Sequence, residues 1–138
     1  MIYKIYDTCS LLFNYKHLFE EDNVRVVISS ITLQELEEIK SSFKKDAEIK
    51  FSARKLLHVL EDNRYKYDLL AYKPAMLAKL FETHEFEETN DMKILACAYF
   101  YDTYVHPDET VFVTNDLALQ TIANLYFGED SITSVKLG

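Results

Sequence analysis

The stretch that decides the fold is "IYKIYDTCSLL", residues 2–12. Its first half is rich in the aliphatic and aromatic residues typical of a β-strand. Apolar residues at helical spacing then predict a helix over residues 10–22. Asp7 stands at the junction. A strand followed directly by a helix is the first half of a βα unit, so this stretch predicts an α/β protein whose first strand ends in a carboxylate.

The same alternation continues along the chain. Further strands are predicted at 24–29, 65–72 and 110–114, with a weaker one at 131–137. Helices are predicted at 32–43, 47–63, 74–84, 89–105 and 115–127, with buried faces that include Phe43, Ile49 and Val105. Parallel strands need such crossover helices, which cover both faces of the sheet. We therefore predict a single three-layer α/β/α sandwich over residues 1–138, with a mostly parallel sheet of four to five strands.

The composition is that of a globular protein in a reducing compartment. The 138 residues are 49% hydrophobic and 28% charged, which suits one compact domain. Apolar stretches fall short of the ~20 residues that a membrane span needs, and we read no secretory signal at the N-terminus. Cys9 and Cys97 are too few for a disulfide framework and lie in apolar contexts. We expect a cytoplasmic protein with reduced thiols and no membrane contact.

The charge distribution leaves room for one local nucleic-acid site. A net charge of −8 argues against a general nucleic-acid coat, because phosphate binding normally rests on Lys and Arg. Bound cations can nevertheless supply positive charge within an acidic protein. Basic residues gather in "KSSFKKDAEIKFSARK", residues 40–55. They form either a solvated helix face or a guide for a phosphate backbone, for which the candidates are Lys44, Lys45, Lys50 and Arg54.

Acidic residues stand at the starts of four predicted elements. Ligands of parallel α/β sheets bind beyond the carboxyl ends of the strands, so these junctions are where a site is expected. Capping is the alternative for Asp91 and Asp116, because a carboxylate satisfies free N–H groups at a helix start. Asp7, at the end of a central strand, is harder to explain by capping. The four candidates are Asp7, Glu35, Asp91 and Asp116.

Four such acids at one edge would call for a counter-charge. Carboxylates ~5 Å apart repel by roughly 3 kcal/mol per pair at an effective dielectric constant near 20. A cluster of them therefore binds protons or cations. Mg²⁺ and Mn²⁺ prefer oxygen ligands, and such ions polarise phosphodiesters and lower the pKa of an attacking water. The spacing alone leaves open whether the four acids converge.

Four segments that together span nearly the whole chain resemble the PIN domain, a metal-dependent ribonuclease fold. They are "IYDTCSLL" (5–12), "VVISSITLQELEEIK" (26–40), "TNDMKILACAY" (89–99) and "VFVTNDLALQTIA" (111–123). The resemblance implies that the four acids are catalytic residues and ligands of Mg²⁺ or Mn²⁺. It implies single-stranded RNA as the substrate, and it makes Thr8, Thr114 and Asn115 the polar neighbours that orient the acids.

Two details refine the resemblance. The segment 31–57 is closest to PIN domains fused to PhoH-type ATPases, although the chain carries no Walker-type glycine loop. Cys9 stands where the family commonly has Asn or Ser, which bears on activity and metal preference. The resemblance also admits a homodimer, an antitoxin partner or a separate ATPase domain.

Two other protein classes also carry an Asp after the first strand, and this sequence lacks the further residues that each of them needs. A haloacid-dehalogenase-type phosphatase needs a second Asp at the position of Cys9, and a response-regulator receiver needs a Lys after the late strand "VFVTND". Two rivals remain beside the ribonuclease. One is a catalytically weak RNA-binding or protein-interaction module, and the other is the toxin of a toxin–antitoxin pair.

Overall fold

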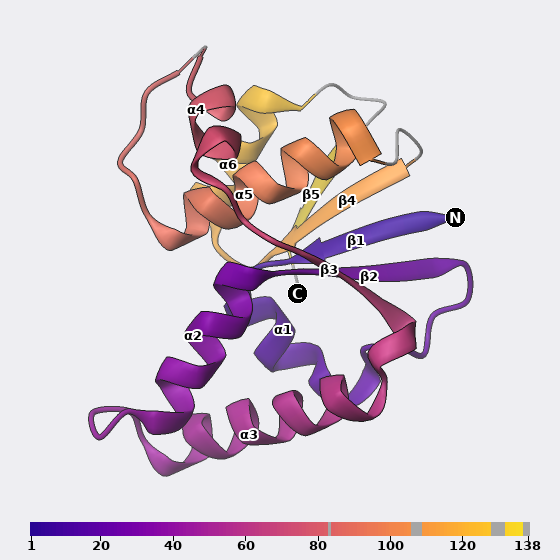
Figure 1. Cartoon of the computed structure of the whole chain (residues 1–138), viewed down its shortest axis with the longest axis vertical. Coiled ribbons are helices and arrows are strands. Elements are labelled where there is room, and N and C mark those ends of the chain that lie inside the picture. Colours follow the sequence, from indigo (N-terminus) through magenta and orange to yellow (C-terminus); the bar gives the residue numbers. More distant parts are fainter. Residues whose placement is uncertain (83, 106–108, 128–131, 137–138) are drawn as a thin grey trace.

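The computed structural model describes residues 1–82, 84–105, 109–127 and 132–136, and it has the predicted three-layer α/β/α architecture (Figure 1). The sheet has five strands in the order β3-β2-β1-β4-β5, and every pairing is parallel. The strands are β1 (Ile2–Tyr6), β2 (Val24–Ser29), β3 (Tyr67–Leu70), β4 (Glu109–Thr114) and β5 (Ile132–Lys136). The outer ends of the predicted last strand, residues 131 and 137, lie outside the described residues.

Six α-helices and three shorter turns connect the described strands. The helices are α1 (Thr8–Asn14), α2 (Ser30–Ser41), α3 (Ala47–Asp62), α4 (Pro74–Leu80), α5 (Asn90–Phe100) and α6 (Leu117–Tyr126). The 3₁₀ turns η1 (Tyr15–His17) and η2 (Arg64–Lys66) follow α1 and α3, and the π-helical turn η3 (Tyr101–Val105) extends α5. Within the described residues, no helix has the length and apolar character that a bilayer span requires.

The central strands bury both faces, and alternate side chains enter two separate cores. Val26 and Ile28 point to the core shared with α1, α2 and α3, whereas Val27 points to the core under α4, α5 and α6. In β4, Phe112 likewise faces the second core and its neighbours in sequence face the first. Figure 1 shows the two helical layers on opposite sides of the sheet. This arrangement explains the near-continuous apolar runs in β2 and β4.

The strand order places β1 in the centre of the sheet. Tyr6 is aligned with Val113 of β4, and Ile5 with Val27 of β2. The next residue after β1, Asp7, therefore lies between the carboxyl ends of its two neighbours. Asp7 also begins α1, since its side chain accepts a hydrogen bond from the Ser10 N–H.

Several sequence predictions of buried positions were wrong. α2 ends at Ser41, because Ser42 adopts an extended backbone, and Phe43 beyond it is fully exposed. Ile49 and Val105 are also exposed, at 39% and 42%. The first helix stops at Asn14 instead of running to residue 22. Cys9 is exposed, whereas Cys97 is buried as its apolar context suggested.

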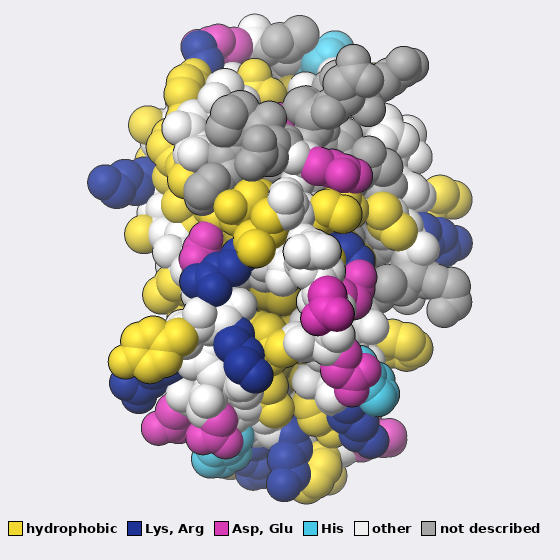
Figure 2. Space-filling view, turned by 90° about the vertical axis from the view of Figure 1, so that its right-hand side faces the viewer, with side chains coloured by type: hydrophobic (Ala, Val, Ile, Leu, Met, Phe, Trp, Pro, Cys, Tyr) yellow, Lys and Arg dark blue, Asp and Glu magenta, His cyan; other side chains and the backbone are white. Residues whose placement is uncertain are grey.

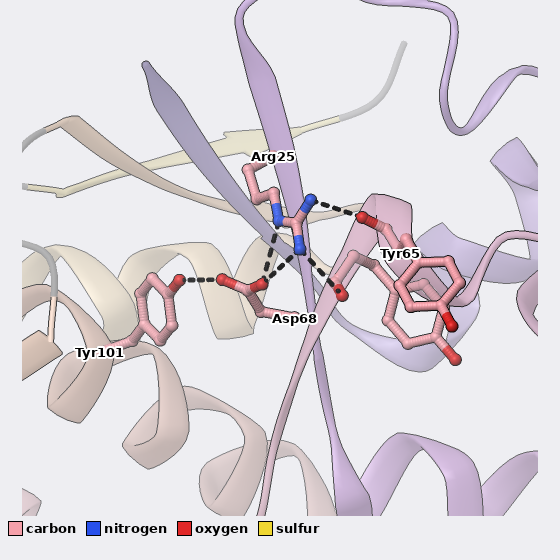
Figure 3. A network of polar contacts seen from close by, with 5 residues as sticks. Arg25, Tyr65, Asp68 and Tyr101 are labelled. Atoms are coloured by element: carbon pink, nitrogen blue, oxygen red, sulfur yellow. Dashed lines mark hydrogen bonds and ion pairs between the residues drawn. The ribbon is translucent and has the colours of Figure 1, made fainter.

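At the amino end of the sheet, the second strand is tied to the edge strand by an ion pair (Figure 3). Arg25 donates to Asp68 Oδ1 from Nε at 2.9 Å and from Nη2 at 2.8 Å, and its Nη1 donates to the Tyr65 carbonyl. The Tyr101 hydroxyl donates to the other oxygen of Asp68 at 2.6 Å. These bonds join β2, β3 and the end of α5.

Figure 2 shows the face of the molecule on which this amino end lies. In the part of the face that is not grey, basic, acidic and apolar side chains are interspersed. Lys4 in β1 pairs with Glu21 at 2.9 Å. The described part of this face therefore offers no continuous basic tract for a nucleic acid.

Candidate functional site

The structure places the four predicted acids at the carboxyl end of the sheet. Asp7 directly follows β1, and Asp116 follows β4 by two residues. Glu35 lies in the second turn of α2, the helix that continues from β2, and Asp91 is in the first turn of α5. Asp7 is buried, Glu35 is half-buried, and Asp91 and Asp116 are exposed. Three elements from distant parts of the chain thus present carboxylates beside the buried one.

Thr114 connects the buried acid to the exposed acid of the next strand. Its hydroxyl donates to Asp7 Oδ2 and accepts from the Asp116 N–H at 3.0 Å. The Asp116 carboxylate in turn accepts from the N–H groups of Ala118 and Leu119, so it caps α6. Asp116 therefore both caps α6 and lies next to the residue that holds Asp7. A role as a helix cap and a role in the candidate site are compatible for this residue.

Glu35 is held by side chains from two other elements. Thr8, the first residue of α1, donates from its hydroxyl to Glu35 Oε1 at 2.8 Å. Asn90, the first residue of α5, makes a second side-chain hydrogen bond to Glu35. Partial burial raises the pKa of Glu35, with smaller contributions from Asp91 and Glu38, while the two hydrogen bonds act against that rise. Asn90 was absent from the predicted site, although its place beside Asp91 in "TND" was a signal for it.

The negative charges of Asp7 and Asp116 act on the carboxyl group of Asp91. Desolvation is the largest cause that raises the pKa of Asp91, and repulsion from Asp7 and then from Asp116 adds to it. Because like charges disfavour ionisation, this shift reports that the three carboxylates share one electrostatic environment. Glu35 is coupled to the same group through Asp91.

Cys9 lies among these acids. Desolvation raises the pKa of its thiol, repulsion from Asp7, Asp91 and Glu35 raises it further, and Lys45 lowers it. The exposed Cys9 side chain thus belongs to the site, which its apolar sequence context did not suggest. The same interaction places Lys45, from the segment between α2 and α3, within electrostatic range of the site.

The remaining predicted residues lie at the surface of the same half of the molecule. Asn115 is exposed between β4 and the cap of α6, and Lys44 is exposed in the segment that carries Lys45. Lys50 and Arg54 lie on α3, half-buried and exposed respectively. The structure therefore links Lys45 electrostatically to Cys9, whereas the other three basic residues are placed only by their elements.

Two hollows differ in their relation to the acids. One of about 240 Å³ is lined by Asp91, Asp116 and an apolar wall from α5, α6 and the segment before α5. A larger one of about 510 Å³ lies against α4 and α5, and its lining of apolar, aromatic and two lysine side chains contains none of the four acids. The smaller hollow is the candidate for chemistry, because it is lined by two of the four acids, one of which, Asp91, has a raised pKa.

The donor chemistry of the site fits a hard divalent cation. All four predicted ligands offer carboxylate oxygens, which Mg²⁺ and Mn²⁺ prefer. As the side chains stand, no three His, Cys, Asp or Glu residues in the described part of the chain are close enough to hold an ion together. The site therefore suits such a cation in the kind and number of its oxygen donors. Asp7, Asp91, Asp116 and Glu35 are the residues that would hold the ion.

Solved structures with the same fold come from bacteria and an archaeon. One is VapBC2 from Rickettsia felis, solved bound to a DNA fragment from the promoter of VapBC2. It shares 18% identity with a TM-score of 0.58, and the match covers 97% of this chain and 98% of that chain. A domain of a functionally unknown protein from Methanocaldococcus jannaschii shares 16% identity with a TM-score of 0.59, covering 99% and 92%. VapBC-1 from nontypeable Haemophilus influenzae shares 19% identity with a TM-score of 0.55, covering 99% and 98%.

At these identities the structures show a common fold. The comparison with curated proteins gave no match. The family comparison is decisive, because the model described as "PIN domain" matches residues 4–126, which include all four acids. The chain belongs to the PIN domain family.

Proposed function

We propose that this protein is a metal-dependent endoribonuclease that hydrolyses single-stranded RNA in the cytoplasm, with Mg²⁺ or Mn²⁺ as its cofactor. The observation that carries the proposal is the convergence of Asp7, Asp91 and Asp116 at the carboxyl end of the parallel sheet: Thr114 joins Asp7 to Asp116, and Asp91 lines the same hollow as Asp116. Carboxylates arranged to repel one another cost stability unless a cation neutralises them. Membership of the PIN domain family supports the same activity.

The residues divide into distinct roles. Asp7, Asp91 and Asp116 would hold the ion, which when bound neutralises the phosphodiester and activates water. Thr114 fixes Asp7 and Asp116 relative to each other. Such hydrogen-bonded neighbours orient ligating carboxylates in metal sites.

Glu35 would position the attacking water. Thr8 and Asn90 hold its carboxylate from α1 and α5, so its orientation depends on both helices. Lys45, with Lys44, Lys50 and Arg54 farther along, would guide the RNA backbone toward the acids. Asn115, exposed beside Asp116, is available to contact the scissile phosphate.

The direct test is cleavage of a labelled single-stranded RNA in Mn²⁺ and in Mg²⁺, with an EDTA control. We expect metal-dependent cleavage that falls on the order of 100-fold or more in Asp91→Asn, because the variant removes a charge that faces the ion. Glu88→Gln is the matched control: Glu88 is exposed just before α5 and pairs with Lys93 at 3.7 Å. It should cleave at the wild-type rate.

Three results would contradict the proposal. Cleavage that persists unchanged in Asp91→Asn would indicate a contaminating nuclease. RNA that is bound but left intact in both metals would favour the binding module, and Cys9→Ser would then test whether the departure at this position lowers activity. Absence of both binding and cleavage over several RNAs would remove RNA as the substrate.

The toxin of a toxin–antitoxin pair is the second candidate function. The fold shared with VapBC2, VapBC-1 and FitAB favours this function. The FitAB structure matches with a TM-score of 0.52 and 15% identity, covering 97% of this chain and 94% of that chain. Induced expression should then arrest growth, and Asp91→Asn should relieve the arrest. Coexpression of a small open reading frame next to the gene should relieve it as well.

A homodimer and a separate ATPase partner of the PhoH type remain predictions. Size-exclusion chromatography tests the first, and copurification tests the second.

A further inference from the structure

The hollow that contains Asp91 and Asp116 is lined by two chemically different kinds of side chain. Its lining includes the two aspartates together with the apolar side chains of Phe86, Met92, Leu119 and Ile122. Met92 and Leu119 are buried in the core under α5 and α6, so this apolar wall is continuous with the protein interior. At about 240 Å³ the hollow is smaller than the ~300–1,000 Å³ typical of sites for whole drug-sized ligands. It suits one small, flat group.

Phe86 is fixed in place although it belongs to the irregular segment before α5. Its ring lies 6.2 Å from the Tyr126 ring at an interplanar angle of 62°, and 6.3 Å from the His84 ring. The Tyr126 hydroxyl donates to the His84 carbonyl at 3.1 Å, which ties the segment to α6. Phe86 is therefore a preorganised aromatic surface, and little conformational entropy is lost when a ligand packs on it.

Charge restricts what can occupy the hollow. Asp91, Asp116 and Glu87 line it, so a phosphate group or an acidic peptide is repelled from it unless a bound cation lies between the negative charges. A nucleobase carries no charge, has two apolar faces for the Phe86 wall, and has N–H groups at its edge that suit a carboxylate acceptor such as Glu87.

We propose that this hollow binds one unpaired nucleobase of the RNA strand, packed on Phe86, next to the phosphodiester that is cut. The inference rests on the proposed function, because acids that would act on the phosphate also line the hollow. Since Asp91, Asp116 and Phe86 line one hollow, a strand with its phosphate at the two aspartates would bring an adjoining base to Phe86. Recognition is then directed to a flat unpaired base, which excludes base-paired RNA at this position.

The test is an abasic scan of a short single-stranded RNA with one mapped cleavage site, in Mn²⁺. For each position near the cut, kcat/KM is measured for the intact RNA and for the RNA that lacks that base. We expect one position at which loss of the base lowers kcat/KM by about tenfold, the usual range of a base–aromatic contact. In Phe86→Ala this ratio should fall to about one. The ratio is taken within each protein, so a reduced folded fraction cancels.

Matched variants separate stacking from general effects. Phe86→Tyr keeps the ring and should keep the tenfold ratio. Tyr65→Ala removes an aromatic side chain that is 94% exposed on η2, far from the acids in the fold, and should also leave the ratio unchanged. A ratio that persists in Phe86→Ala, or a scan that is flat in the wild type, would overturn the inference while the nuclease proposal stands. A flat scan is also the result expected if the hollow receives an apolar side chain of a protein partner.

A binding measurement keeps the two proposals distinguishable if no RNA is cut. A short RNA with a single 2-aminopurine is titrated with protein in Ca²⁺, and fluorescence quenching is compared between the wild type and Phe86→Ala. Quenching that depends on Phe86 supports the base pocket even in a protein without nuclease activity. No quenching at any position of 2-aminopurine overturns it.

Discussion

The two ends of the sheet use the same residue type in opposite ways. At the amino end, Asp68 accepts two hydrogen bonds from Arg25 and one from Tyr101, so its charge is compensated within the protein. At the carboxyl end, Asp91 is coupled to Asp7 and Asp116, which carry the same charge. Compensation inside the fold stabilises it, whereas acids without such compensation are what makes the carboxyl end the candidate functional site.

α5 connects these two ends. Asp91 lies in its first turn, and Tyr101 follows its last residue. Burial is the main cause that raises the pKa of Tyr101, with the hydrogen bond to Asp68 second, so the phenol remains a proton donor to Asp68. One helix is thus fixed by polar bonds at its carboxyl end and presents an acid at its amino end. A firm anchor at one end allows the other to keep a costly arrangement of charges.

The largest expected effect on stability comes from breaking the compensated end. Asp68→Ala removes the carboxylate that accepts from Arg25 and from the Tyr101 hydroxyl, and leaves Arg25 with its bonds to backbone carbonyls, so it should lower the free energy of unfolding by about 2 kcal/mol. This is below the ~3–5 kcal/mol for a fully buried pair, because the Arg25 and Asp68 side chains are 32% and 33% exposed. Urea denaturation measures the change. Arg25→Met and the double variant complete a cycle, and strictly additive effects would contradict a coupled pair.

A smaller loss is expected for Tyr101→Phe. The substitution removes one hydrogen bond to a charged acceptor and keeps the ring that packs 5.5 Å from Tyr3. We expect a decrease of about 1 kcal/mol in the free energy of unfolding, since Asp68 keeps its two bonds from Arg25. Thermal unfolding followed by circular dichroism is suitable, with Tyr65→Phe at the exposed ring as the control. An unchanged melting temperature would show that the hydroxyl bond contributes nothing net.

The smallest effect, and one of opposite sign, is expected at the uncompensated end. A raised pKa means that folded protein binds the Asp91 proton more tightly than unfolded protein, so ionisation disfavours the fold. This penalty is absent well below the ordinary value of 3.8 and complete above the raised pKa. Asp91→Asn should therefore be more stable than the wild type at neutral pH in EDTA, and the difference should vanish as the pH falls. Solvent screening keeps it small.

Urea titrations at several pH values, with Glu88→Gln as the control, measure this difference. A variant that is less stable than the wild type at neutral pH would show that the first-turn position of Asp91, where a carboxylate favours the helix dipole, outweighs the repulsion. Adding Mn²⁺ should reverse the order, because an ion that binds only the folded wild type stabilises it.

Much of the fold could be predicted because its signals are local. Each described strand and α-helix corresponds to a predicted one, and the position of Asp7 between β2 and β4 follows from the rule for parallel sheets. Helix ends were less predictable. Phe43 continues the apolar period of α2, but the extended backbone at Ser42 ends the helix before it. Periodicity records spacing and carries no information about where the backbone hydrogen bonds stop.

The contacts that complete the candidate site join residues far apart in the sequence. The Thr8–Glu35 bond spans 27 residues and the Thr114–Asp7 bond spans 107, so no local pattern contains either pair. The same holds for Arg25 and Asp68, 43 residues apart. Phe86 was one of many aromatic residues in the sequence, and only its packing with His84 and Tyr126 distinguishes it.

The span between Asp7 and Thr114 has a consequence for synthesis. Among the described strands β1 is synthesised first, and its partner β4 begins 103 residues later, counted from Tyr6 to Glu109. A nascent chain that ends before β4 holds Asp7 and Glu35 but has no hydroxyl to join Asp7 to Asp116. The complete set of acids therefore arises only after the chain has been synthesised through Asp116, so the candidate site forms late relative to β1, the strand at its centre.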